Sequence, residues 1–163
     1  MDDVILLQTM NDLIDRATSA ILTTLNAEGW PETRAMLNLR NPNQFKGLIK
    51  FMAEKATAED LSMYFTTNSG STKMSHLRSD PRVSLYYHMV GEFRGLMLSG
   101  TMEIIEEVAL KQEIWQPGWE LYYHDGREDP DYAVLRFNCE WAKYYHGQET
   151  HTLHLKTKHW EHY

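Results

Sequence analysis

A segment that alternates strand, turn, helix and strand constrains the fold of this chain more than any other part of it. Residues 61–66 and 83–88 are rich in β-branched and aromatic residues and predict two strands. Residues 72–79 predict a short helix, which Asp80-Pro81 ends. The polar residues 68–73 join the first strand to this helix. This turn therefore brings two hydroxyl groups and a lysine to the beginning of a helix.

The beginning of this helix is chemically suited to a phosphate group. Helix N-termini carry unpaired N–H groups and about half a positive charge. A phosphate monoester brings roughly −1.5 to −2 charge and several strong acceptors. Ser71, Thr72 and Lys73 supply the hydroxyls and the cation that such a group needs. A second interpretation stays open, in which an ordinary serine caps the helix and the lysine is solvated.

The composition predicts a single folded domain that spans residues 1–163. Hydrophobic residues make up 42% of the chain and aromatic residues 12%, which is typical of a globular protein. No apolar run approaches the roughly 20 residues of a membrane span, and nothing resembles a secretory signal. The single cysteine, Cys139, lies in an apolar strand pattern and is expected to be a small core residue. These features predict a cytoplasmic protein without membrane contact.

The distribution of charge favours a small anionic ligand over nucleic acid. The net charge of −7 argues against a nucleic-acid partner, because such binding depends on Lys and Arg. Residues 61–100 nevertheless carry four basic and two acidic residues, a local excess of +2. The turn that suits a phosphate thus lies in the one basic segment of an acidic chain.

The remaining pattern predicts a mainly β, α+β fold. Residues 1–18 are expected to form an N-terminal helix and residues 106–115 another. Further strands are expected at residues 19–25, 30–39, 96–105, 132–138 and 140–146. Residues 41–58 are expected to form a long connection with at best a short strand near 48–52, and residues 147–163 a polar tail or edge strand. Successive antiparallel strands with few central helices predict a small β-barrel with flanking helices over its ends.

The strand expected at residues 30–39 carries an unusual row of side chains. Alternation places Arg34, Met36 and Asn38 on one face of this strand. A guanidinium beside a methionine and an asparagine is consistent with a row that faces a ligand. An exposed sheet face explains it equally well.

Four stretches in this order resemble a known family. They are residues 21–36, which end in Arg-x-Met, residues 64–87, residues 98–103, and residue 115 with residues 125–137. The chain resembles the pyridoxamine 5′-phosphate oxidase-like FMN-binding split-barrel family, and within it the general stress protein branch. The resemblance implies an antiparallel split β-barrel and a homodimer whose two composite sites bind FMN.

The resemblance also implies which residues hold the cofactor. Arg34 would pair with the phosphate or ribityl chain of FMN, and the two residues after it would contact the flavin. Two threonines would line the ring and ribityl tail, and three residues at the start of the short helix would hold the phosphate. The full set is Arg34, Ala35, Met36, Thr66, Thr67, Ser71, Thr72 and Lys73.

The chain departs from the oxidase itself at three places. Leu39 stands where the oxidase carries a lysine, and Arg94-Gly95 stands where it carries an Arg-Gln pair. Residues 152–158 lack its Arg-Leu-His-Asp-type motif. Oxidation of pyridoxamine phosphate is therefore not expected.

The expected function is that of an FMN-dependent oxidoreductase acting on a small-molecule redox substrate, with a nicotinamide cofactor as one candidate. No acid–base pair identifies catalytic residues, which suits chemistry carried by a cofactor. A non-catalytic module that binds or senses FMN, a deazaflavin or haem remains the alternative.

The histidines and a cluster of aromatic residues admit more than one interpretation. His151-x-x-His154 and His159-x-x-His162 do not match a zinc pattern, so a solvated tail is expected and no metal site. His88 and His124 are either proton donors near a flavin or ordinary surface residues. The aromatic residues would stack on a flavin or substrate, or form core or dimer interface. They are Trp115, Trp119, Tyr122 and Tyr123.

Overall fold

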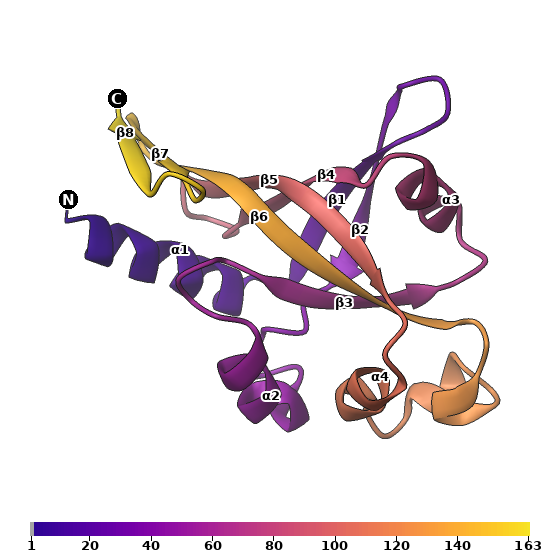
Figure 1. Ribbon diagram of the computed structural model, residues 1–163. Helices are drawn as coiled ribbons and strands as arrows, with labels where there is room; N and C mark the ends of the chain where they lie inside the picture. The colour runs from indigo at the N-terminus through magenta and orange to yellow at the C-terminus, as the bar shows by residue number, and fades with distance from the viewer. Residues whose placement is uncertain (1) are drawn as a thin grey trace.

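The computed structural model describes residues 2–163 and contains one antiparallel sheet of eight strands with helices around it (Figure 1). The strands are β1 (Ser19–Leu25), β2 (Pro31–Leu37), β3 (Met63–Asn68), β4 (Arg82–His88), β5 (Arg94–Ile105), β6 (Tyr132–His146), β7 (Glu149–His154) and β8 (His159–His162). The helices are α1 (Asp3–Arg16), α2 (Ile49–Lys55), α3 (Thr72–Ser79) and α4 (Val108–Ile114), with short 3-10 turns at η1 (Lys46–Leu48), η2 (Trp119–Leu121) and η3 (Gly126–Glu128). The strand order β2-β1-β4-β5-β6-β7-β8, with β3 also paired to β6, confirms the predicted mainly β antiparallel fold.

Strand β6 is shared by three neighbouring strands. Its residues 132–137 pair with β3, its residues 141–146 pair with β7, and β5 follows it along the other edge. A register shift against β5 leaves Glu140 as an extra residue, a bulge that bends a strand. A side chain on Gly100 would overlap the carbonyl oxygen of Asn138, so glycine allows β5 to approach β6 at this point.

This bulge explains one error of the sequence prediction. The predicted strands at residues 132–138 and 140–146 form a single strand, β6. Cys139, the residue at the expected break, pairs with Gly100 beside the bulge. A bulge interrupts the ladder without ending the strand, and residue type alone does not separate the two cases.

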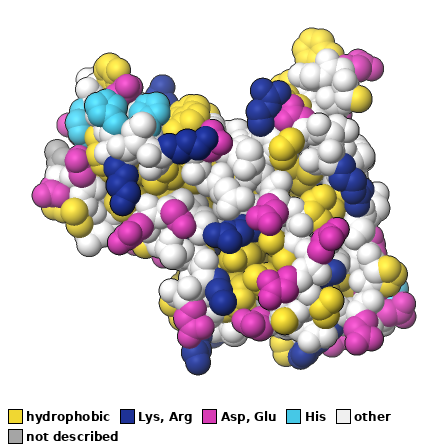
Figure 2. Space-filling view, in the orientation of Figure 1, with side chains coloured by type: hydrophobic (Ala, Val, Ile, Leu, Met, Phe, Trp, Pro, Cys, Tyr) yellow, Lys and Arg dark blue, Asp and Glu magenta, His cyan; other side chains and the backbone are white. Residues whose placement is uncertain are grey.

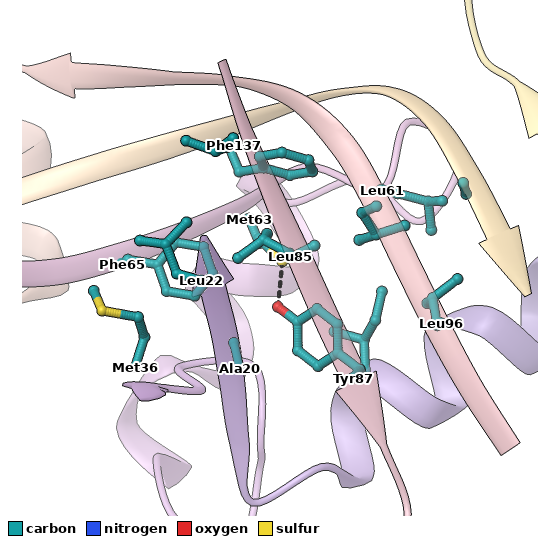
Figure 3. Close-up of a cluster of buried hydrophobic side chains, with 14 of the residues drawn as sticks. Ala20, Leu22, Met36, Leu61, Met63, Phe65, Leu85, Tyr87, Leu96 and Phe137 are labelled. Carbon is teal, nitrogen blue, oxygen red and sulfur yellow. Dashed lines mark hydrogen bonds between the residues drawn. The ribbon is translucent and has the colours of Figure 1, made fainter. Parts of the chain in front are cut away.

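The main core lies between α1 and the sheet (Figure 3). The buried side chains of α1 recur at helical spacing, and they are Leu6, Met10, Leu13 and Ile14. Figure 3 shows Tyr87 of β4 pointing at Met63 of β3, to whose sulfur its hydroxyl donates a hydrogen bond of 2.6 Å. This contact links two strands that are not paired with each other.

A second core packs α2, α4 and the aromatic-rich residues 115–130 against β3 and β6. The strand expected near residues 48–52 is wrong, because this segment is helical from η1 into α2. Leu48, Phe51 and Met52 are buried at helical spacing. Their apolar partners come from distant parts of the chain, such as Tyr64 and Ile114.

The C-terminal residues form an ordered hairpin, so the expectation of a solvated tail is wrong and that of an edge strand is nearer to the structure. Strands β7 and β8 pair along residues 151–162. His151 is buried, and its Nδ1 lies 2.7 Å from Nδ1 of His162. Figure 2 shows histidines gathered at this end of the molecule. Within residues 2–163, no group of three or more His, Cys, Asp or Glu side chains converges as a metal site.

The helices of the described chain carry no candidate membrane span. The longest of them, α1, has 14 residues, and no helix in residues 2–163 is long and apolar enough to cross a bilayer.

We expect Cys139 to be unreactive in the folded protein. It is half-buried against the main core, and burial raises the pKa of its thiol to about 12. At pH 8 the thiolate fraction would be ~10⁻⁴, against roughly a quarter for an unperturbed thiol. Labelling with a chromogenic disulfide at pH 8 should therefore be slow for native protein and fast in denaturant. Equally fast labelling of both states would show that the thiol is accessible.

Candidate functional site

A pocket of about 290 Å³ opens where β2, β3 and the start of α3 meet the aromatic loop, which we define as residues 115–130. Strands β2 and β3 form one wall, and the aromatic loop forms the other. The lining residues are Ala35, Met36, Leu37, Thr66, Thr67, Asn68, Lys73, Trp119, Tyr122 and Tyr123. Five residues of the set implied by the resemblance therefore meet at one place, although they come from three separate segments.

Lys73 is bound within this site rather than solvated. Its Nζ donates a hydrogen bond of 2.8 Å to Oγ1 of Thr67. Burial, and then the nearby charge of Arg34, lower the pKa of Lys73 below its ordinary value. Both effects destabilise the charged ammonium of Lys73. An anion bound beside it would offset this destabilisation.

Arg34 precedes the lining residue Ala35 on β2, and its charge is near enough to Lys73 to lower the pKa of the lysine. Its Nη1 donates to Oγ1 of Thr24 at 2.7 Å, and its Nη2 lies 4.0 Å from a carboxylate oxygen of Glu32. Burial lowers the pKa of Arg34, and the charge of Glu32 partly offsets this effect. Thr24 also contacts Nδ1 of His76 at 2.9 Å, so Arg34 is held by a small polar network.

Ser71 occupies the N-cap position of α3 but does not cap it with its side chain. Its hydroxyl makes no hydrogen bond to the helix, and its Oγ is buried without a partner among the described residues. Thr72 follows as the first residue of the helix. Ser71 and Thr72 do not line the pocket directly, but they immediately precede Lys73, which does. The interpretation of a capping serine is therefore wrong, and the lysine beside it is half-buried and bonded to Thr67 instead of freely solvated.

The aromatic residues divide into core and surface. Trp115 packs edge-on against Tyr132 at 5.1 Å between ring centroids and belongs to the second core. Trp119 and Tyr123 are buried and also line the pocket, and burial raises the pKa of Tyr123 to about 12. Tyr122 is 64% exposed at the pocket. His88 and His124 are exposed and lie outside the pocket lining.

The row of side chains expected to face a ligand from β2 and the residue after it is wrong for Asn38. Asn38 is buried, and its amide donates to the carbonyls of Ile14 and Ala17, so it holds the end of α1 and faces no ligand. Ala35 and Leu37 lie on the exposed face instead. Sequence reasoning missed Leu37 and Asn68 as lining residues. Strand alternation relates Leu37 to Ala35 and was the available signal.

A larger hollow of about 700 Å³ lies between α1 and the C-terminal hairpin, and it suits an anion poorly. Four of its five charged lining residues are acidic, namely Asp3, Asp12, Asp15 and Glu59, against Lys158. The smaller pocket is therefore the better candidate for an anionic ligand.

A family comparison decides what kind of protein this is. A sequence model described as pyridoxamine 5′-phosphate oxidase like matches residues 6–158. The chain belongs to the pyridoxamine 5′-phosphate oxidase-like family. A search of curated proteins gives no match.

Solved structures support the same family and the split-barrel fold. A protein related to general stress protein 26, from Clostridium acetobutylicum, is 29% identical with a TM-score of 0.75, over 97% of this chain and all of that one. A pyridoxamine 5′-phosphate oxidase-related, FMN-binding protein from Nostoc punctiforme is 12% identical with a TM-score of 0.59, over 98% of this chain and 93% of that one. A heme-binding protein from Mycobacterium smegmatis is 14% identical with a TM-score of 0.65, over 93% of this chain and 59% of that one. The last two show similarity of fold alone.

We expect Ser71→Ala to leave the free energy of unfolding almost unchanged, within ~0.5 kcal/mol, because its hydroxyl makes no capping hydrogen bond. Asp2→Ala is the matched control, since Asp2 does cap α1 through a 2.8 Å hydrogen bond to the Val4 N–H. That variant should lose about 0.5–2 kcal/mol. Urea unfolding measures both. A loss for Ser71→Ala as large as that for Asp2→Ala would show that Ser71 caps the helix.

Proposed function

We propose that this protein binds FMN in the pocket between β2, β3 and the aromatic loop, and that it acts as a flavin-dependent oxidoreductase on a small-molecule redox substrate. One observation carries the proposal. Two partly buried cations, Lys73 and Arg34, stand close enough that the charge of Arg34 lowers the pKa of the lysine. The Ser71 hydroxyl, which has no partner among the described residues, lies two residues before Lys73. Charge-assisted hydrogen bonds to a phosphate would satisfy all three groups.

The residues of the site would bind and orient the cofactor. FMN supplies redox chemistry through its ring when it is bound. Lys73 and Arg34 would neutralise the phosphate, with Ser71 and Thr72 donating to its oxygens. Thr66 and Thr67 on β3, opposite Ala35 and Met36 on β2, would border the ribityl chain and ring. On the other wall, the rings of the aromatic loop would exclude water from the flavin.

A homodimer with composite sites is part of the proposal. Ligand sites in proteins usually enclose about 300–1,000 Å³ and bury most of the ligand. One chain offers about 290 Å³, and Leu37 in its wall is 48% exposed. A second copy over β2 would cover Leu37 and complete the enclosure.

We also propose a cytoplasmic location, which is supported by a single half-buried cysteine.

A non-catalytic flavin or deazaflavin module is the second candidate, because no acid–base pair in the pocket requires turnover. Haem is less well supported. The described lining of the pocket contains no histidine or cysteine, two common axial ligands of haem iron. Oxidation of pyridoxamine phosphate is not proposed, since Leu39 is buried in the second core and offers no cation.

We expect the purified, untreated protein to show flavin absorption bands and to release FMN on denaturation. It should also sediment at twice 19.1 kDa. Bleaching of the bands by a reduced nicotinamide cofactor under anaerobic conditions would support the oxidoreductase. A flavoprotein that no physiological reductant bleaches would instead favour the binding module. Protein that stays colourless after incubation with FMN contradicts both.

We expect Lys73→Ala and Arg34→Ala each to weaken FMN binding by roughly 1.5–3 kcal/mol, because each removes a charge-assisted hydrogen bond to the phosphate. Quenching of flavin fluorescence on titration measures the affinity. Lys50→Ala and His154→Ala are the controls, since Lys50 is exposed on α2, His154 lies on β7, and neither lines the pocket. Unchanged affinity in both site variants would remove the assignment of the site.

A further inference from the structure

We infer that Asp131 is a positioning residue for the phosphate end of the flavin site. It lies between the aromatic loop and β6, and it holds the turn of residues 68–71 that leads into α3. The inference rests on the proposed function, because it assigns to Asp131 the geometry of the groups that would bind the FMN phosphate.

Asp131 contacts three successive residues of this turn. Its Oδ2 accepts a hydrogen bond of 2.5 Å from the side-chain amide of Asn68, and its Oδ1 accepts one of 3.0 Å from the backbone N–H of Gly70. Its carbonyl oxygen accepts the N–H of Ser69 at 2.8 Å. The Ser69 hydroxyl adds a bond of 3.0 Å to the carbonyl of Pro130. One short segment therefore fixes the turn through both side-chain and backbone atoms.

The hydrogen bonds keep Asp131 ionised. The bond from Asn68, and then the bond from the Gly70 N–H, lower the pKa of this carboxyl below its usual value. An ionised carboxylate accepts both bonds at once, whereas a protonated one would lose acceptor capacity.

This arrangement divides the donors of the turn between protein and ligand. The N–H groups of Ser69 and Gly70 are taken by Asp131. The Ser71 hydroxyl has no partner among the described residues. Of the first N–H groups of α3, that of Met74 donates to the Ser71 carbonyl, whereas those of Thr72 and Lys73 have no carbonyl one turn earlier within the helix. The acidic residue thus holds the turn from one side and leaves the hydroxyl and the helix start for an anion.

Asp131 also connects the two walls of the pocket. The aromatic loop that precedes it supplies Trp119, Tyr122 and Tyr123, and the turn that it holds follows β3 directly. Asn68 pairs with Tyr132 at the end of the β3–β6 ladder, which places Asp131 next to the turn. Loss of the Asp131 side-chain hydrogen bonds should therefore displace the phosphate-binding groups while the β3–β6 ladder persists.

The test compares FMN with riboflavin, which has the same ring and ribityl chain but no phosphate. We expect the wild type to prefer FMN, and Asp131→Ala to weaken FMN binding about 10-fold while riboflavin binding stays within about 2-fold. Asp131→Asn should restore most of the preference, because an amide still accepts from Gly70 and the Asn68 amide can turn over. Asp125→Ala is the matched control, since it removes the same charge from an exposed position of the same loop.

Asp131→Glu tests the position of the carboxylate without changing its charge. This variant tests the inference if Asp131→Ala does not fold. It keeps the carboxylate but moves it by one methylene, so we expect a selective loss of FMN affinity. Equal losses for FMN and riboflavin, with a lower Tm, would overturn the inference and leave Asp131 a merely structural residue. An unchanged preference in both variants would overturn it as well. Failure of the wild type to bind either flavin would reject the proposed function itself, and this inference with it.

Discussion

The backbone ladder of β6 is the constraint on which the other features of this structure depend. One strand of 15 residues pairs with β5 along its length and with β3 and β7 in turn. The bulge at Glu140 bends it between its two partners. Since β3 carries Thr66 and Thr67, and the aromatic loop ends where β6 begins, this ladder brings both walls of the pocket together. The N-terminal half of β6 therefore sets the geometry of the candidate site.

The electrostatics of the site contrast with those of the whole chain. The protein carries a net charge of −7, yet it keeps Lys73 and Arg34 partly buried beside each other. Glu32 lies near Arg34, and Lys73 bonds only the neutral Thr67 among the partners that the structure describes. Two cations that are partly removed from water and lie near each other, such as Lys73 and Arg34, destabilise one another. An anion bound beside them, as proposed above, would offset this cost.

The aromatic loop serves the fold and the site together. Trp115 and Tyr132 pack edge to face in the second core, and the Tyr132 hydroxyl donates to the carbonyl of Lys111 at 2.8 Å. These contacts anchor the loop at its base. Tyr122 stays exposed at the pocket, where a cofactor ring or a second copy of the chain would cover it. A rigid base below an exposed ring is the arrangement expected of a binding wall.

Local signals predicted those elements that depend on neighbouring residues. The β-branched run at residues 19–25 and the helix at 72–79, stopped by Asp80-Pro81, appear with the predicted bounds. Helix α2 was missed because its apolar residues are buried by side chains from distant parts of the chain, such as Tyr64 and Ile114. The C-terminal residues were predicted as a polar tail or an edge strand, and the second strand of the hairpin was missed for a similar reason, since β8 forms through cross-strand pairing with β7.

The sequence alone predicted the fold class, because strand alternation, turn residues and helix stops act over a few residues. Its resemblance to a known family pointed to the family that the comparison then showed. Only the tertiary structure decided that Lys73 is bound to Thr67, that Asn38 faces α1, and that the Ser71 hydroxyl has no partner within residues 2–163. It also brought Asp131 to a turn more than 60 residues earlier in the chain. Such contacts depend on burial and on the register of β3 against β6, two strands that lie far apart in the chain, so they follow from tertiary pairing and not from neighbouring residues.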